Sequence, residues 1–154
     1  MDKKALEKMT DKYLSPYGMQ KKSTSWYKET NDVLQIVNLQ KSEFSNKFYL
    51  NIGLLPFGIA VYGMPRPKEH KFPIRIRMSA LYPGTAALLE NVLDLEYGVL
   101  SDSDREAKFS EIITRQLLPF LTEVSSKSDI KHAAIEGRFS GGLVNLMAKK
   151  QLGL

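Results

Sequence analysis

Three segments between residues 24 and 55 have the residue types of β-strands and pair in one consistent way, which limits the fold more than any other feature of the chain. They are Thr24–Glu29, Val33–Lys41 and Lys47–Leu55. A two-residue turn at positions 31 and 32 joins the first two segments as a hairpin and sets Trp26 opposite Val37. The same register sets Tyr27 opposite Ile36, so that large apolar side chains meet across the strands. Trp26 is therefore predicted to be a packing residue of the core.

A second hairpin, with its turn at positions 45 and 46, joins the second and third segments. In this register Leu39 faces Ile52 on one side of the sheet, and Gln40 faces Asn51 on the other. A slip of one residue would break both matches, because side chains alternate between the two faces of a strand. The pattern therefore predicts an antiparallel meander.

Apolar and basic residues alternate in the stretch 73–78, which is the next predicted strand. Its even-numbered side chains, which would face the core, are Ile74, Ile76 and Met78. Arg75 and Arg77 would point together out of the opposite face, about 7 Å apart along the strand. Two parallel guanidinium groups suit a carboxylate or a phosphate. The sequence leaves open whether the two arginines are exposed or paired with carboxylates of a covering helix.

Apolar residues at helical spacing predict one helix at the start of the chain and another after the strands. Asp2 is the expected cap of the first helix, which ends near Ser15. Thr85 is the expected cap of the second, which runs to about Leu95. The expected buried stripe of the second helix comprises Leu88, Leu89, Val92 and Leu93.

The last third of the chain predicts further helices. Ser103 and Glu106 have the spacing of a capping box that opens a helix over residues 104–124, and Pro119 is expected to kink or break it. Ser128 is the expected cap of the next helix, and a glycine-rich turn at 137–142 precedes a last helix over 143–152. The expected fold is an α+β domain: an antiparallel meander sheet of four to five strands, with helices packed on one face and the other face at least partly open.

Length and composition indicate one domain over residues 1–154. The chain has no cysteine, which excludes disulfides and thiolate metal sites. No apolar run approaches the roughly 20 residues of a membrane-spanning helix, and the first residues contain no apolar signal-peptide segment. A cytoplasmic protein without a membrane partner is therefore expected. The formal charge of +5 favours acidic partners, although the lysines are scattered along the chain.

The main candidate site is the polar face of the predicted sheet. Its residues on these registers are Tyr27, Asn38, Gln40, Tyr49, Asn51, Arg75 and Arg77. Asparagine and glutamine are poor strand formers, so that several of them facing one way favour a ligand-binding role. The alternative is an ordinary solvated face, which is common in antiparallel sheets.

Three other clusters are weaker candidates. The turn at 137–142 lacks the Gly-Lys-Ser/Thr ending of a phosphate-binding loop. The acidic residues Asp94, Glu96, Asp102 and Asp104 do not have calcium-loop spacing. His70 and His132 are isolated from each other and are predicted to be surface residues. No metal and no cofactor is therefore expected. No known catalytic motif is present, so the sequence identifies no catalytic residue and leaves an enzymatic activity open.

The runs Ser25–Lys28, Val37–Ser42 and Phe48–Gly53 resemble, in their order and spacing, the bacterial family called domain of unknown function 4304. The first helix, the strand at 74–77, Leu81-Tyr82 and the last three residues are also similar to that family. The resemblance covers nearly the whole chain. It implies a bacterial, cytosolic, single-domain protein and brings no catalytic residue and no assigned activity.

Three functions remain open. The leading hypothesis is a non-enzymatic binding module that uses the face around Arg75 and Arg77 to hold an acidic protein surface or a small anion. The second, less favoured, is sequence-independent nucleic-acid binding, which needs a basic stripe with exposed aromatic side chains. The third is a small hydrolase or transferase, which needs a pocket containing a reactive carboxylate or histidine. The oligomeric state is not specified by the sequence.

Overall fold

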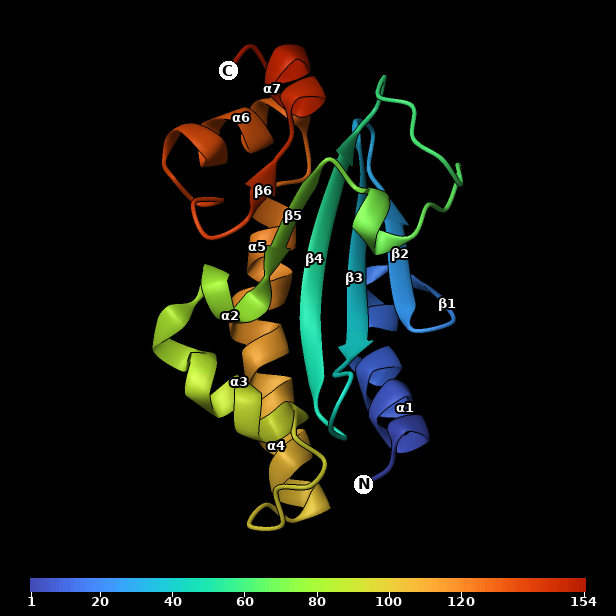
Figure 1. The fold of residues 1–154 in the computed structure, drawn as a ribbon, viewed down its shortest axis with the longest axis vertical. Helices are drawn as coiled ribbons and strands as arrows, with labels where there is room; N and C mark the ends of the chain where they lie inside the picture. The colour runs from blue at the N-terminus through green and yellow to red at the C-terminus, as the bar shows by residue number, and fades with distance from the viewer.

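A computed structural model describes residues 1–154 and places six strands in one antiparallel sheet, in their order along the chain (Figure 1). The strands are β1 (Gln20–Lys22), β2 (Ser25–Glu29), β3 (Val33–Lys41), β4 (Phe48–Pro56), β5 (Ile74–Arg77) and β6 (Leu143–Val144). The predicted α+β antiparallel meander is confirmed, although the sheet has six strands rather than four to five. The edge strands β1 and β6 span three and two residues, too few for alternation to reveal them in the sequence.

Helices cover one face of the sheet and both of its ends, and the opposite face is partly open. They are α1 (Lys3–Leu14), η1 (Ser15–Tyr17), η2 (Glu69–Lys71), α2 (Met78–Leu81), η3 (Pro83–Thr85), α3 (Ala86–Leu93), α4 (Asp102–Ile112), the π-helical turn η4 (Ile113–Leu117), α5 (Leu118–Glu123), α6 (Lys127–Ile135) and α7 (Leu146–Leu152). Figure 1 views the sheet from its open face, with α4 and α5 behind it and η2 in front. None of the helices combines the length and the apolar character that a membrane crossing requires.

The first predicted register is confirmed and the second is corrected. Trp26 pairs with Val37 across β2 and β3, as predicted. Across β3 and β4, however, Leu39 pairs with Leu50 rather than Ile52, a shift of two residues. The Ser42 N–H donates to the carbonyl oxygen of Lys47, so the loop between β3 and β4 consists of residues 43–46 and is longer than the predicted two-residue turn. A shift of two keeps every side chain on its predicted face, so alternation alone does not distinguish the two registers.

The helix-covered face of the sheet forms the core. Trp26, Val37 and Ile52 lie side by side across β2, β3 and β4, and each is at most 1% exposed. The predicted packing role of Trp26 is therefore confirmed. Gln35 lies on the same face, and its Nε2 donates to the carbonyl oxygen of Leu121 at 2.7 Å. This bond satisfies a carbonyl near the end of α5 and ties that helix to β3.

The opposite face is partly covered by the segment 57–73, which connects β4 to β5. Phe72 is 2% exposed and packs on Gly53 at the centre of β4. A Cβ at Gly53 would lie 2.6 Å from Ile36 and 2.9 Å from the Phe72 ring, so this position requires glycine for the segment to approach the sheet. The rest of this face remains open, which fits the expectation of a partly open sheet.

Helix starts differ from the predictions by small shifts. Asp2 caps α1 as predicted. The predicted capping box is wrong, because Ser101 rather than Ser103 caps α4. Similarly, Ser126 rather than Ser128 caps α6. In both stretches the predicted serine is preceded, two positions earlier, by another serine. Either side chain could accept from the backbone N–H three residues after it, and in the structure the earlier serine is the cap.

The structure also corrects α3 and the long helix. The Thr85 side chain does not cap α3, and Leu88 is 37% exposed instead of belonging to the buried stripe. The long helix was expected to kink or break at Pro119. The structure shows no break there: the irregularity is the widened turn η4 just before the proline, and the helix continues into α5. A π turn loosens the backbone where the proline ring would otherwise meet a carbonyl one turn earlier.

Helix α1 is joined to the rest of the domain by polar contacts as well as by its buried residues. The indole Nε1 of Trp26 donates to Asp11 Oδ1 at 2.9 Å. Glu106 on α4, which the predicted capping box would have used, accepts from Lys12 and from the Tyr13 hydroxyl. The hydrogen bonds from Lys12 and then from Tyr13 lower the pKa of the Glu106 carboxyl.

Replacing Glu106 with glutamine is expected to reduce the acid sensitivity of the protein. Because the folded-state pKa of Glu106 is lowered from 4.5, its stabilising contribution is present above that value and is lost as the pH falls through the folded-state pKa. Urea unfolding at several pH values between about 6 and about 3 measures this. The wild type should lose more free energy of unfolding over this range than Glu106→Gln. Equal losses would contradict the prediction.

Candidate functional site

Strand β5 presents its two arginines on the open face, as the alternation predicts. Ile74 and Ile76 are 1% and 4% exposed and face the helices. Arg75 pairs across the strands with Gly53, and Arg77 pairs with Asn51. Met78 is buried as predicted but belongs to α2, because the strand ends at Arg77. The predicted alternation along β5, with Ile74 and Ile76 facing the core and the two arginines facing the open side, is therefore confirmed.

Amide side chains form a connected row on the same face. Asn51 is buried, and its Nδ2 donates to Gln40 Oε1 at 2.9 Å and to Asn38 Oδ1 at 3.4 Å. Asn38 in turn donates to the Ser25 hydroxyl at 2.9 Å. The row runs across β2, β3 and β4 and leaves Gln40 exposed. Because the amides bond to one another, their orientation is fixed before any ligand arrives.

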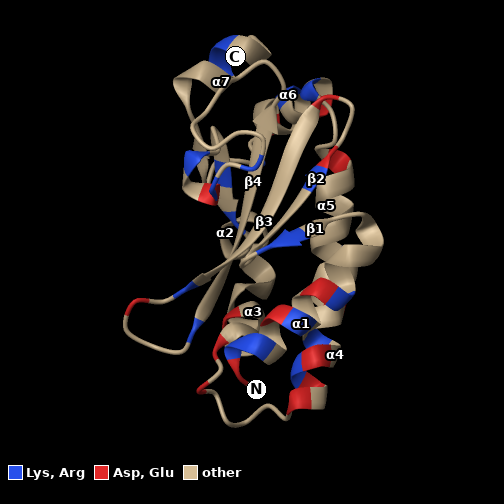
Figure 2. Cartoon of the chain, turned by 90° about the vertical axis from the view of Figure 1, so that its right-hand side faces the viewer, with Lys and Arg blue, Asp and Glu red and all other residues tan.

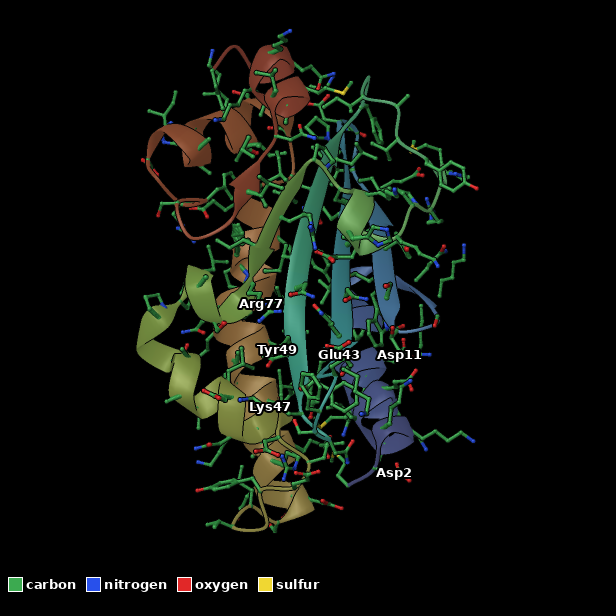
Figure 3. All side chains as sticks on the ribbon, viewed as in Figure 1. Asp2, Asp11, Glu43, Lys47, Tyr49 and Arg77 are labelled. Atoms are coloured by element: carbon green, nitrogen blue, oxygen red, sulfur yellow. The ribbon has the colours of Figure 1, made fainter.

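Arg77 lies at one end of the amide row and has no carboxylate partner. Its guanidinium carbon lies 4.0 Å from the centre of the Tyr49 ring, which holds the side chain by a cation–π contact. Lys47 lies beyond Tyr49, and Figure 3 shows these three side chains following one another along the edge of the sheet. Lys47 pairs with Glu90, whose hydrogen bond raises the pKa of the Lys47 ammonium group. Arg77 is thus an exposed, positioned cation.

Arg75 is paired with a carboxylate of a short helix that covers part of the open face. Its Nε donates to Glu69 Oε1 at 2.9 Å, and its Nη2 donates to Glu69 Oε2 at 3.1 Å. Glu69 belongs to the short helix η2, which lies across the open face. This answers a question that the sequence left open: Arg77 is exposed, and Arg75 forms a bidentate ion pair with the carboxylate of Glu69 on η2.

Tyr27 serves as an anchor for the segment 57–73 rather than as an open binding surface. It is 4% exposed, and its hydroxyl donates to the carbonyl oxygen of Pro67 at 2.8 Å. Burial raises the pKa of the Tyr27 phenol, so that the hydroxyl keeps the proton it donates. Of the predicted site residues, the open face therefore brings together Asn38, Gln40, Asn51, Arg75 and Arg77, with Tyr49 beneath Arg77.

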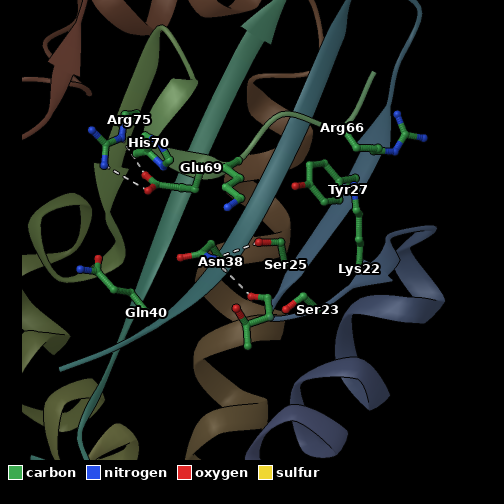
Figure 4. Close-up of a pocket in the computed structure, with 12 residues that line it drawn as sticks. Lys22, Ser23, Ser25, Tyr27, Asn38, Gln40, Arg66, Glu69, His70 and Arg75 are labelled. Carbon is green, nitrogen blue, oxygen red and sulfur yellow. Dashed lines mark hydrogen bonds and ion pairs between the residues drawn. The ribbon is translucent and has the colours of Figure 1, made fainter. Parts of the chain in front are cut away.

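Two adjoining hollows lie over these residues. The larger, of about 430 Å³, is bounded by the β1–β2 turn, the amide row and η2, and Tyr27 is its only apolar lining residue (Figure 4). The smaller, of about 360 Å³, extends over Arg77 to the turn before β6. Gln40, Glu69 and Arg75 line both. The Arg75–Glu69 pair therefore stands where the two hollows meet.

The lining of the two hollows is strongly basic. Its charged side chains are Lys22, Arg66, Lys68, Arg75 and Arg77 against a single carboxylate, Glu69. Arg66 also forms an ion pair with Glu29 on β2, with 2.9 Å between Arg66 Nη1 and Glu29 Oε1. The residues contributed by β1 and by the segment 57–73 were missed in the sequence. Their only signal was the concentration of charge in the stretch 66–71, since nothing in the spacing predicts that this segment folds over the sheet.

The weaker candidate clusters have other roles or no shared geometry. In the glycine-rich turn, a Cβ at Gly142 would lie 2.3 Å from the carbonyl oxygen of Arg75, so the glycine allows the chain to approach β5 and form β6. No group of three or more His, Asp or Glu side chains is arranged to hold a metal ion. His132 lies on α6 beside Glu136, and His70 is exposed at the rim of the larger hollow.

Comparison with known proteins gives one match. The chain matches no curated protein and no solved structure. The model of the family described as a domain of unknown function, DUF4304, matches residues 10–123, which run from within α1 to the end of α5. The match includes β1 to β5 and so every strand of the open face except β6. As the resemblance predicted, the chain belongs to the DUF4304 family.

Proposed function

We propose that this protein is a non-enzymatic binding module that holds an anionic partner, an acidic polypeptide or a small anion, on the open face of its sheet. The observation that carries the proposal is Arg77, an exposed cation positioned on Tyr49 and free of any carboxylate, within a strongly basic lining. A charge of this kind is available to a ligand without first breaking an internal pair. The neighbouring amide row supplies hydrogen-bonding groups that are already oriented.

The chemistry of the face favours an acidic polypeptide over a nucleic acid. Single-stranded nucleic acids are held by aromatic side chains on which bases stack. Here Tyr27 is buried, and Arg77 covers a face of the Tyr49 ring. Figure 2 also shows basic and acidic residues alternating along α1 and α4, so neither of these helices presents a continuous basic stripe. Guanidinium groups and side-chain amides instead match the carboxylates and backbone carbonyls of a peptide.

A fluorescein-labelled hexaglutamate peptide, titrated at low salt, tests the proposal. Arg77→Gln is expected to weaken peptide binding by about tenfold, the loss of one charge-assisted contact. The matched control is Arg115→Gln, because Arg115 is also exposed but lies on η4, behind the sheet. Arg115→Gln should leave the dissociation constant unchanged. Neither variant should change the free energy of unfolding, measured in urea, by more than about 0.5 kcal/mol.

Two results would contradict the proposal. The first is absence of hexaglutamate binding to the wild type, with a hexaglutamine peptide behaving identically. The second is equal loss of binding in Arg77→Gln and Arg115→Gln, which would indicate attraction by net charge alone. A labelled oligothymidylate provides the comparison with nucleic acid: tighter binding of it than of hexaglutamate, with a steep salt dependence, would favour phosphate contacts instead.

A further inference from the structure

The Arg75–Glu69 pair has an unusual position for an ion pair that only supports the fold. It stands at the junction of the two hollows, and its guanidinium lines both. The Glu69 side chain is 10% exposed, whereas the Arg75 side chain is 35% exposed. Glu69 thus occupies the Nε–Nη2 edge of the guanidinium, and the remaining part of Arg75 stays accessible from the hollows.

Glu69 is also the only acidic side chain in a lining that is otherwise basic. A planar guanidinium edge is geometrically matched to a carboxylate, which it binds through two parallel hydrogen bonds. The protein itself therefore places a carboxylate on the group that would recognise one from outside. An incoming carboxylate that takes the Nε–Nη2 edge of Arg75 would compete with Glu69 for the same two N–H donors.

The contacts that hold the segment 57–73 on the sheet do not involve the Glu69 side chain. Two contacts hold the segment on either side of η2: the Tyr27 hydroxyl bonds to the carbonyl of Pro67, and Phe72 is buried on Gly53. The backbone of η2 is closed by the Phe72 N–H donating to the carbonyl oxygen of Glu69 at 3.0 Å. A rotation of the Glu69 side chain disturbs none of these bonds.

We infer that Glu69 is an internal competitor that occupies Arg75 until a carboxylate of an acidic polypeptide partner replaces it. The inference rests on the proposed function, that the open face binds such a partner, and adds how the site is restrained. Arg77 provides the first, unobstructed contact, and Arg75 becomes available when Glu69 is displaced. The resting protein consequently holds acidic segments more weakly than its arginines alone would allow.

Glu69→Gln tests the inference, because glutamine keeps the shape of the side chain and removes its charge. With the labelled hexaglutamate peptide, Glu69→Gln is expected to bind at least about tenfold more tightly than the wild type. The matched control is Glu111→Gln on α4, which removes the same charge from the far side of the sheet and should change affinity by less than about twofold. In the double variant Glu69→Gln with Arg75→Gln, the gain should disappear.

A charge-swapped variant keeps the test decisive if Glu69→Gln loosens the segment. Glu69→Arg combined with Arg75→Glu preserves an ion pair between η2 and β5 but puts the carboxylate on the sheet. It should keep the urea midpoint near that of the wild type and bind hexaglutamate more weakly than the wild type, because only the contact with Arg77 remains. Binding at the full wild-type affinity would overturn the inference, because recognition would then not depend on a guanidinium at position 75.

The possible failures are distinguishable. If the wild type binds hexaglutamate in an Arg77-dependent manner and Glu69→Gln gives no gain over Glu111→Gln, the internal-competitor role is wrong and the proposed function stands. If neither the wild type nor Glu69→Gln binds the peptide, the proposed function is wrong and the inference falls with it. A gain in Glu69→Gln that persists without Arg75 would also overturn the inference, since the competition would not be for that guanidinium.

Discussion

Arg105→Met is expected to lower the free energy of unfolding by about 3 kcal/mol, because Arg105 is a buried cation that holds the end of α3 through four carbonyl oxygens. The side chain is 2% exposed and extends from α4. The carbonyls belong to Asn91, Val92, Asp94 and Tyr97. Methionine fills a similar volume but donates no hydrogen bond, so these oxygens would lose their partner at the point where α3 meets the following loop.

The expected loss is smaller than the sum of four separate bonds. Arg105 has no carboxylate partner, and its Nε is buried without an acceptor, so its removal also relieves an unfavourable burial. Urea unfolding followed by the fluorescence of Trp26, the single tryptophan, measures the effect. Arg115→Met is the matched control, since Arg115 is exposed and pairs only with Glu111 one turn away; its effect should stay below about 0.5 kcal/mol. Equal effects of the two substitutions would show that Arg105 is not a structural donor.

Gly53→Ala is expected to destabilise the protein by about 2 kcal/mol and to disturb the candidate site at the same time. The added methyl group would meet Ile36 at 2.6 Å and the Phe72 ring at 2.9 Å, and both of these side chains are buried. We expect Phe72 to be pushed outward, and the Glu69-bearing segment with it. Binding of the hexaglutamate peptide should therefore change together with stability, although position 53 does not line either hollow.

Gly98→Ala is the control for this substitution, because a Cβ at Gly98 would meet no atom within 4 Å. It should leave both the urea midpoint and peptide affinity near their wild-type values. Restoring space with Gly53→Ala combined with Phe72→Leu should recover part of the lost stability. If Gly53→Ala were as stable as the wild type, the close packing of the segment 57–73 on β4 would not be needed for the fold.

The sequence predicted the faces of the strands better than it predicted their alignment. The alternation of Arg75 and Arg77 with Ile74 and Ile76 directly reports which side chains are buried, because burial follows the period of a strand. The β3–β4 register was wrong by two residues because both alignments satisfy the same period. The longer turn that decides between them depends on a bond from Ser42 to Lys47, for which composition gives no signal.

The candidate site was predicted in part for a related reason. The amides and both arginines lie on strands, where the alternation of side chains predicts from the sequence which face each one occupies. The partner of Arg75 lies in a connection instead, and its position depends on Phe72 packing against a glycine on β4. Contacts of this kind are tertiary, so neither Glu69 nor the buried Arg105 had a local pattern by which to be recognised. Arg105 was missed because its neighbours suggested a helix cap rather than a core cation.

Strand β6 pairs with the outer edge of β5, although its residues, 143–144, lie beyond the segment 10–123 that matches the family. A version of the protein shortened to that segment would leave the N–H and C=O groups of this edge without a strand beside them. Such bare edges are templates for intermolecular pairing. Because β6 covers the edge of β5 at Ile74 and Arg75, we expect a version shortened to residues 10–123 to aggregate more readily than the longer chain.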